Sequence, residues 1–202
     1  MSATLISIIG PIGVGKTTLA EKLAELLSGQ VLYEDYEGNP FLAGSYAGLE
    51  ELILPSQLYF MMSRVKQLSD LTFPAEGIVV ADFAFCQDRM YAKHNLADDD
   101  RLFYEHITRQ VEFMVHSPAI IVNLDASVAT LKSRIASRGR PFEQAIAPNF
   151  LEYLRQQHLE FTPPKGCFEI RIDCDKTDIT DQANLKNLAD KISQNIQNWK
   201  IS

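Results

Sequence analysis

Short apolar runs alternate along this chain with longer segments in which apolar residues recur every three or four positions. The short runs are typical of strands buried on both faces, and the longer spacing is typical of the helices that cover them. Strands are predicted at residues 5–9, 31–34, 77–82, 119–124 and 168–173, and helices at residues 18–27, 56–71, 98–116, 128–137, 149–160 and 181–199. This alternation predicts a doubly wound α/β fold, with a five-stranded parallel sheet whose ligands bind at the carboxyl ends of the strands.

The most specific local pattern follows the first predicted strand. Residues 10–17 read Gly-Pro-Ile-Gly-Val-Gly-Lys-Thr, a complete G-x-x-x-x-G-K-T phosphate loop in a strand–loop–helix context. Its backbone N–H groups converge on a phosphate, Lys16 reaches the outer phosphates, and the Thr17 hydroxyl holds Mg2+. The residues expected at the donor phosphates are Gly10, Gly13, Val14, Gly15, Lys16, Thr17 and Thr18. The pattern predicts that the chain binds a nucleoside triphosphate, and a glycine-rich turn that binds nothing is the disfavoured alternative.

Two predicted strands end in carboxylates, the second in Glu34 and the third in Asp82. In a parallel sheet both ends lie beside the phosphate loop. A kinase needs a base near the acceptor hydroxyl and a carboxylate that helps to position Mg2+. We assign Glu34 to the first role and Asp82 to the second, although either acid taken alone is equally well explained as a cap of the next helix or turn.

Arginines recur where the helix at residues 128–137 is expected to end. Arg134 and Arg138 are four residues apart and share a helical face. Gly139 and Pro141 then interrupt the helix around Arg140. Guanidinium groups at such a break suit a lid, at about residues 137–147, that closes over the transferring phosphoryl group. The alternative is a solvated basic face.

The segment between the second and third predicted strands contains a candidate acceptor site. Gln57 and Arg64 are two helical turns apart, so they share a face. An amide and a guanidinium there could bind the edge of a nucleobase enclosed by Phe41, Tyr46 and Phe60. The spacing alone favours the alternative, an ordinary amphipathic helix with its aromatic residues in the core and its polar pair outside.

The composition narrows the class of protein. The chain has 202 residues, 46% of them hydrophobic and 22% charged, which predicts one globular domain over residues 1–202. The net charge of −7 argues against nucleic acid as the main partner. No apolar run approaches the ~20 residues that span a bilayer, and no basic segment precedes the first strand, so neither a membrane anchor nor a signal peptide is expected. The three cysteines lack C-x-x-C spacing and are expected to be reduced core thiols in a cytoplasmic protein.

Over nearly its whole length the chain resembles the deoxynucleoside kinases, particularly the bacterial deoxyadenosine/deoxyguanosine kinase branch. The resemblance rests on the phosphate loop at residues 10–17, Tyr-Glu-Asp-Tyr-Glu-Gly-Asn-Pro at 33–40, Gln57 with Arg64, Val-Ala-Asp at 80–82 and Arg-Gly-Arg-Pro-Phe-Glu at 138–143. The phosphate loop is common to many families. The stretch at 33–40, Gln57 and the lid motif in this order are much more specific.

The resemblance implies a P-loop NTPase-type kinase with a lid, ATP as donor, Mg2+ and a homodimer. It implies that Glu34 takes the proton of the nucleoside 5′-hydroxyl and that Gln57 hydrogen-bonds the base. Tyr46 and Glu143 match the pair that binds the sugar 3′-hydroxyl. Arg134, Arg138 and Arg140 match the lid arginines, Asp82 matches an acid near Mg2+, and Arg64 and Asp88 match a pair near the base.

One departure from the family pattern lies directly after Asp82. The family has an acidic-Arg-Ser motif, whereas this chain reads Asp82-Phe83-Ala84. In many members that arginine helps to hold the 5′-hydroxyl and the catalytic acid. Arg89 is too far along the chain to replace it without a different backbone path.

The sequence therefore predicts ATP-dependent phosphorylation of a deoxynucleoside at its 5′-hydroxyl, as in nucleotide salvage. Deoxyadenosine or deoxyguanosine is expected to be the acceptor, with deoxycytidine as the main competitor. The first alternative is a nucleoside monophosphate kinase, which would need further basic residues around the acceptor phosphate. The second is a regulatory protein that senses or hydrolyses ATP, which would need a side chain that positions water.

Overall fold

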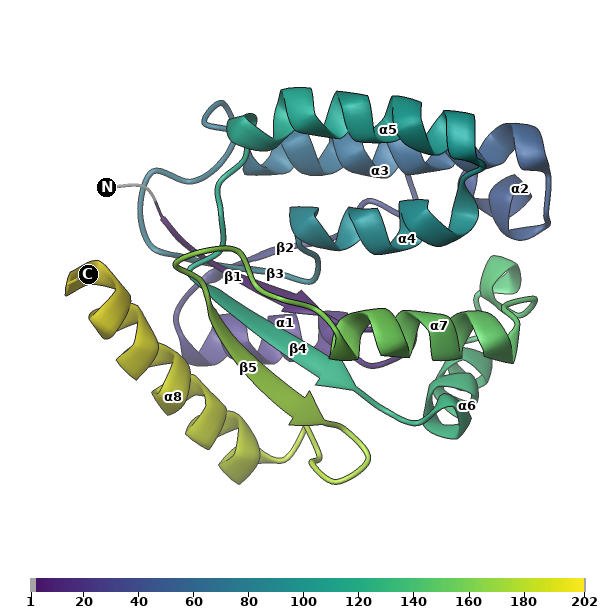
Figure 1. Ribbon diagram of the computed structural model, residues 1–202. Coiled ribbons are helices and arrows are strands. Elements are labelled where there is room, and N and C mark those ends of the chain that lie inside the picture. The colour runs from purple at the N-terminus through teal and green to yellow at the C-terminus, as the bar shows by residue number, and fades with distance from the viewer. Residues whose placement is uncertain (1–2, 202) are drawn as a thin grey trace.

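The sheet consists of five parallel strands in the order β2-β3-β1-β4-β5, which confirms the predicted fold class. Figure 1 shows the computed structural model of the chain, which describes residues 3–201. The strands are β1 Thr4–Ile9, β2 Gln30–Leu32, β3 Ile78–Ala81, β4 Ile120–Asp125 and β5 Phe168–Asp173. Because all five run in the same direction, their carboxyl ends meet at one edge of the sheet.

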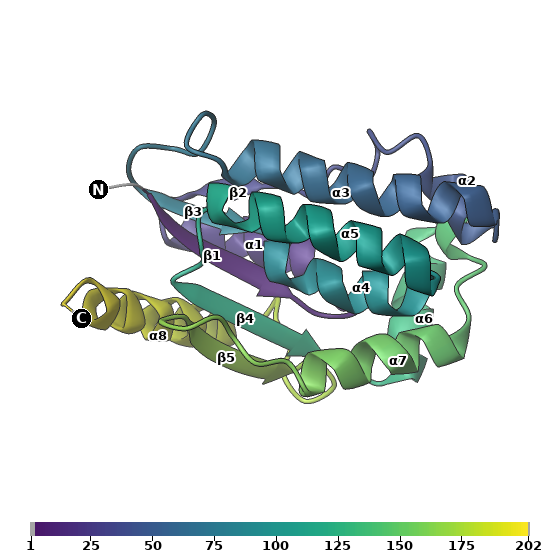
Figure 2. The same ribbon diagram turned by 45° about the horizontal axis from the view of Figure 1, so that its top comes forward.

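Helices cover both faces of this sheet. They are α1 Lys16–Leu26, α2 Leu42–Tyr46, α3 Ile53–Leu68, α4 Asp88–Asn95, α5 Asp98–Val111, α6 Val128–Arg138, α7 Pro148–Leu159 and α8 Gln182–Ile201. Short 3-10 turns lie at Glu50–Leu52, Phe85–Gln87, Glu112–Met114 and Pro141–Glu143. Figures 1 and 2 show α3, α4 and α5 on one face, α1 and α8 on the other, and α6 and α7 beyond the carboxyl ends of the strands. No helix within residues 3–201 has both the length and the apolar character to cross a membrane.

The continuous apolar character of the strands follows from burial on both faces. Ile6 and Ile8 of β1 pack into the core that α1 and α8 cover. Leu5, the residue before Ile6, packs with Leu68 of α3 and with Phe83 on the opposite face. Successive side chains of a strand point to opposite faces, so a strand covered on both sides needs apolar residues at both sets of positions.

Two helices were not predicted from the sequence. α2 is a short helix, and α4 is largely polar, so neither has a long apolar period. The predicted second strand was also too long, because β2 ends at Leu32 and Glu34 lies in the loop beyond it. The helix predicted at 56–71 begins earlier, at Ile53, and takes Pro55 into its first turn, where a missing N–H costs no helical hydrogen bond. The helix predicted at 98–116 ends at Val111 and passes into a 3-10 turn.

A buried histidine lies at the end of α7. His158 is 1% exposed, and its carbonyl accepts a hydrogen bond of 2.8 Å from the Nδ2 of Asn123 in β4. Neither ring nitrogen has a hydrogen-bond partner within the described part of the chain. Burial lowers the pKa of this imidazole to about 3, so the folded protein holds it neutral.

This histidine predicts a loss of stability on mild acidification. Below its ordinary pKa of 6.5 the unfolded chain takes up a proton that the folded chain refuses until about pH 3, so stability falls as the pH drops through this window. The cost between pH 7 and pH 5 is about 2 kcal/mol of unfolding free energy. Urea unfolding at the two pH values measures it for the parent and for His158→Leu, which lacks the titrating group and should lose less stability on acidification. His106→Gln, at an exposed histidine, is the control and should behave like the parent. An equal loss in the parent and in His158→Leu would contradict the assignment.

Candidate active site

A cavity of about 230 Å³ lies among the phosphate loop, the loop after β2, and helices α3 and α4. It brings together residues that lie far apart in the sequence, and most of those predicted as site residues line it. They are Gly13, Gly15, Lys16, Thr17, Thr18, Glu34, Tyr46, Gln57, Phe60, Arg64, Asp82, Asp88, Arg138, Arg140 and Glu143. Gly10, Val14, Phe41 and Arg134 were also named from the sequence but do not line the cavity.

The phosphate loop is packed closely against α6. Gly13 has φ +85°, and a Cβ there would lie 2.8 Å from the Cγ1 of Ile135 and 3.0 Å from the Leu131 carbonyl. Only glycine tolerates both the backbone angle and this approach. Arg134 of α6 donates a 2.7 Å hydrogen bond from Nη1 to the carbonyl of Val14, so this arginine contacts the backbone of the loop.

The lysine of the loop is buried beneath its curve. Lys16 Nζ donates to the carbonyl oxygens of Gly10, at 3.0 Å, and of Pro11, at 3.3 Å. Burial lowers the pKa of this ammonium, whereas the nearby carboxylates of Glu34 and Asp82 raise it. A cation that is partly stripped of water and held near neutral carbonyls is well placed to bind phosphate oxygens.

Asp82 connects the phosphate loop with the loop that carries Glu34. Its Oδ2 accepts a 2.5 Å hydrogen bond from the Thr17 hydroxyl, and its Oδ1 accepts one of 2.7 Å from the backbone N–H of Glu34. Burial raises the pKa of this carboxyl, and the hydrogen bond from Thr17 works against that rise. Thr17 and Asp82 thus place two oxygen ligands side by side, the donor type that Mg2+ prefers. Residues 3–201 contain no cluster of three or more His, Cys, Asp or Glu side chains that could hold a metal ion.

The loop after β2 is held by side chains of its own and of α3. Asp35 Oδ1 accepts from the N–H of Gly38 at 3.0 Å, and Asp35 Oδ2 accepts from the Tyr59 hydroxyl at 2.6 Å. The buried Asn39 donates from Nδ2 to the carbonyl and the hydroxyl of Ser56, at 3.2 and 3.1 Å. These contacts fix the path of the chain that presents Glu34, a structural role for the stretch at 33–40 that the sequence did not reveal.

The polar pair on α3 faces inward. Gln57 is 7% exposed and Arg64 is 4% exposed, and both line the cavity. The amphipathic alternative, with this pair outside, is therefore wrong. Arg64 donates from Nη2 to Glu34 Oε1 and from Nη1 to Asp88 Oδ1, so one guanidinium joins two carboxylates from different elements.

The segment predicted to be a lid lines the cavity on the side of α6. Arg138 donates to Oε2 of the buried Glu143 from Nε at 3.0 Å and from Nη2 at 2.6 Å, and Arg140 donates to Oε1 of the same side chain at 3.3 Å. The Arg140 guanidinium also lies 3.8 Å from the centre of the Tyr36 ring. Gly139 ends α6 in the left-handed conformation, at φ +69°, which supplies the break that the sequence indicated.

Several residues of the cavity were missed by sequence reasoning. They are Ile12, Tyr36, Leu42, Ser45, Ser56, Tyr91, Asn95 and Phe142. Tyr91 and Asn95 lie three and seven residues after Asp88 on α4, so a helix assigned there would have placed them on the face of Asp88. Burial raises the pKa of the Tyr91 phenol, which stays protonated. Phe142 stacks on Tyr46 with ring centres 6.1 Å apart, a contact between segments that no local pattern indicates.

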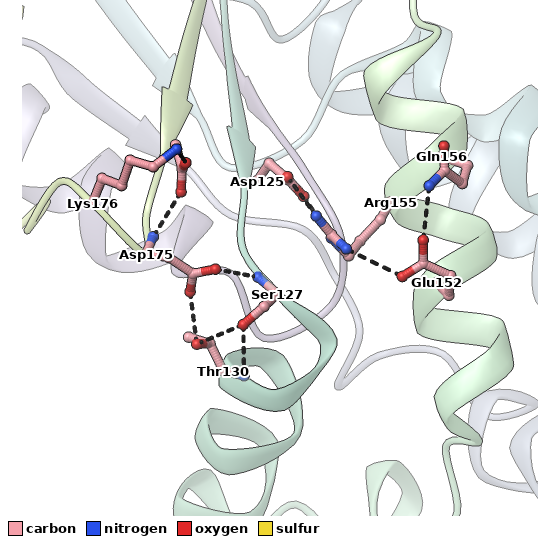
Figure 3. A network of polar contacts seen from close by, with 9 residues as sticks. Asp125, Ser127, Thr130, Glu152, Arg155, Gln156, Asp175 and Lys176 are labelled. Carbon is pink, nitrogen blue, oxygen red and sulfur yellow. Dashed lines mark hydrogen bonds and ion pairs between the residues drawn. The ribbon is translucent and has the colours of Figure 1, made fainter.

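Polar side chains at the ends of β4 and β5 anchor α6 and α7, the two helices that flank the segment predicted to be a lid (Figure 3). Arg155 of α7 donates from Nε and Nη2 to the two carboxylate oxygens of Asp125, each at 2.9 Å. Asp175 accepts from the N–H of Ser127 and from the Thr130 hydroxyl, both at 2.7 Å, at the start of α6. The start of α6 and the second half of α7 are therefore tied to the sheet. The segment between them is held by the ion pairs of Glu143, by Gln144, which donates to the carbonyls of Ile135 and Arg140, each at 3.2 Å, and by the stacking of Phe142 on Tyr46.

Comparison with known proteins gives consistent matches. The model of the deoxynucleoside kinase family matches residues 6–197. A deoxyguanosine kinase of Bacillus subtilis (strain 168) is 35% identical over 156 residues, which cover 76% of this chain and 75% of the relative. A deoxyadenosine/deoxycytidine kinase of the same strain is 26% identical over 201 residues, which cover 94% of this chain and 92% of the relative.

Solved structures share the fold. A deoxyadenosine kinase from M. mycoides with products dCMP and a flexible dCDP bound has a TM-score of 0.79 at 22% identity, over 95% of this chain and 99% of that one. The structure of deoxyadenosine kinase from M. mycoides with bound dATP has a TM-score of 0.76 at 23% identity, over 94% of this chain and 99% of the other.

Proposed function

The chain belongs to the deoxynucleoside kinase family, and on that premise we propose that it transfers the terminal phosphate of ATP to the 5′-hydroxyl of a purine deoxynucleoside. The observation that carries the proposal is the shared cavity. Lys16 and Thr17 of the phosphate loop, Glu34, and the Gln57–Arg64 face of α3 all open into it. A donor phosphate and an acceptor hydroxyl bound in one cavity are placed for in-line phosphoryl transfer, in which positioning and charge stabilisation supply most of the catalysis.

Each reacting group has a candidate partner in this chain. Glu34 accepts the proton of the acceptor hydroxyl, and Lys16 with the loop N–H groups binds the donor phosphates. Thr17 and Asp82 hold Mg2+, which supplies charge neutralisation between the donor phosphates when it is bound. Arg138 and Arg140 bind the transferring phosphoryl group from the lid side, and Arg134 supports them through the phosphate loop.

The acceptor is recognised at the other end of the cavity. Gln57 offers its carbonyl to the adenine amino group and its NH2 to a ring nitrogen, and Phe60 covers the base. Tyr46 and Glu143 bind the sugar 3′-hydroxyl. The Arg64–Asp88 pair disfavours thymine, whose carbonyl and methyl group would leave buried charge without a matching partner. The names of the curated relatives, which include deoxyguanosine and deoxyadenosine/deoxycytidine kinases, support this choice of acceptors.

The remaining features are proposed for the whole chain. We place residues 1–202 in one kinase domain with a lid at about 137–147, acting in the cytoplasm in nucleotide salvage, with neither nucleic acid nor a membrane as partner. A homodimer through α3 and α5 is supported by large apolar side chains exposed on these neighbouring helices and just beyond them. They are Met62, Leu102, Phe103, Phe113 and Met114.

A panel of the four deoxynucleosides with ATP and Mg2+ tests the proposed function. We expect the highest kcat/KM for deoxyadenosine, then deoxyguanosine, with deoxycytidine the main competitor and thymidine the poorest acceptor. ADP should form only when a nucleoside is present, and Lys16→Ala should melt like the parent yet transfer no phosphate. A highest kcat/KM for thymidine would show the base-edge assignment to be wrong, and ADP formation without a nucleoside would contradict the kinase proposal.

The role of Glu34 predicts a contrast with its neighbour Glu37. Glu34→Gln removes the proton acceptor but keeps the shape of the side chain, so kcat should fall ~10²-fold or more with little change in nucleoside affinity. Glu37 is exposed and lies in the same loop, which makes Glu37→Gln the matched control with near-parental turnover. Steady-state kinetics and calorimetric nucleoside binding measure both. If Glu37→Gln were the damaging change, the base would be assigned to the wrong carboxylate.

The lid predicts a change of mobility on ligand binding. Gly139 and Pro141 interrupt the helical hydrogen-bond ladder, so backbone N–H groups in residues 137–147 should exchange rapidly in the free protein. A bisubstrate analogue that bridges the two ends of the cavity should slow this exchange, because phosphates bind Arg138 and Arg140. Hydrogen exchange followed by mass spectrometry measures it, with α8 as the internal control. Equal protection of residues 137–147 with and without the analogue would argue against a lid.

A further inference from the structure

Arg64 lies between the two ends of the cavity. Its guanidinium contacts Glu34, the proposed base, through Nη2 and contacts Asp88, on the helix at the nucleobase end, through Nη1. The side chains of Arg64 and Asp88 are 5% and 3% exposed, whereas that of Glu34 is 23% exposed and so remains open to the cavity. Within residues 3–201, Arg64 is the one side chain that donates a hydrogen bond to the Glu34 carboxylate.

The residue that follows Asp82 explains why Arg64 is needed beside Glu34. Phe83 is fully buried in the apolar cluster on the α3 face, so the chain has no cation there. Instead, the Phe83 ring lies 5.8 Å from the Arg64 guanidinium, and the Phe60 ring lies 5.5 Å from it. Two aromatic rings therefore flank the guanidinium and restrict its orientation.

The other arginine near this position does not reach the site. Arg89 forms a 2.6 Å ion pair with Glu112, and its side chain is 59% exposed. A surface pair of this kind contributes little energy and lies away from the cavity. Arg64 is therefore the cation that the fold places on the proposed base.

We propose that Arg64 is the positioning residue for Glu34, and that it fills the place of the arginine that is absent after Asp82. This inference rests on the proposed function. Asp88 holds the same guanidinium. The orientation of the Glu34 carboxylate, the proposed general base, therefore depends on Asp88 at the nucleobase end of the cavity. A side chain that only recognised the nucleobase would affect each substrate differently, whereas a side chain that orients Glu34 affects the proton transfer common to all of them.

The test compares Arg64→Met/Asp88→Asn with Asp88→Asn. Removing Arg64 alone would leave a buried carboxylate without its partner and endanger folding, so Asp88→Asn supplies a background in which that charge is already absent. The difference between these two variants isolates the Arg64–Glu34 contact. We expect kcat to fall a further ~10²-fold in the double variant, by a similar factor for every deoxynucleoside that the parent phosphorylates.

The split between kcat and KM supplies a readout that a merely structural role would not give. Because Arg64 acts on the proposed general base, the double variant should lose kcat while the KM of each deoxynucleoside stays close to that of Asp88→Asn. Gln57→Ala is the control for nucleobase recognition, and its effects should fall on KM and differ from one deoxynucleoside to the next. Arg89→Met is the control for an arginine outside the site and should retain parental kinetics. Thermal melting of each variant confirms that it folds.

The outcomes separate the two proposals. If the parent phosphorylates no deoxynucleoside, the proposed function fails. If the parent is active but the double variant keeps the kcat of Asp88→Asn for any deoxynucleoside, or loses activity through KM alone, Arg64 does not position Glu34 and this inference is overturned. A fall in kcat that differs strongly between bases overturns it as well.

Discussion

The site depends on one continuous chain of polar contacts that joins five separate parts of the sequence. Thr17 donates to Asp82, Asp82 accepts from the backbone of Glu34, and Arg64 joins Glu34 to Asp88. A buried charge without a partner is costly, so each of these side chains is stable only where its partner lies within hydrogen-bonding distance. The chain of contacts thereby fixes the phosphate loop, the loop after β2, the end of β3, α3 and α4 relative to one another.

The parallel sheet makes this convergence possible. β1, β2 and β3 are neighbours in the order β2-β3-β1, and each passes at its carboxyl end into a segment that carries site residues. Lys16 starts α1, Glu34 follows β2, and Asp82 follows β3 directly. Both faces of the sheet are mostly apolar and covered by helices, and the charged groups of the site gather at this edge. The position of the site is therefore set by the packing of the core.

The sequence predicted those parts of the molecule in which local pattern and tertiary structure agree. Residues 10–17 join the end of β1 to the start of α1 through a glycine-rich loop, and all the predicted strands are present. Gln57 is a residue for which local pattern and tertiary structure disagree. Helical spacing alone favoured an exposed Gln57 side chain, whereas the folded protein buries it. The helix that packs beside α3 at the cavity is α4, which was not predicted because its sequence is mostly polar. Tyr91 and Asn95 were missed for the same reason, and Phe142 because its stacking partner lies nearly a hundred residues away in the sequence.

The roles proposed for Arg138, Arg140 and Glu143 depend on the ion pairs that join these three side chains. Arg138 and Arg140 both donate to Glu143, whose carboxylate is buried. In the proposed complex, phosphate oxygens would share these two guanidinium groups with Glu143, so that neither the arginines nor the buried carboxylate would be left without an opposite charge. Each carboxylate oxygen can accept a second hydrogen bond, which leaves Glu143 able to bind the sugar hydroxyl that its proposed role assigns to it. Under these proposed roles, closure over the phosphates and recognition of the sugar would involve the same carboxylate, so a lid held by Glu143 would favour the complex that contains both substrates over either binary complex.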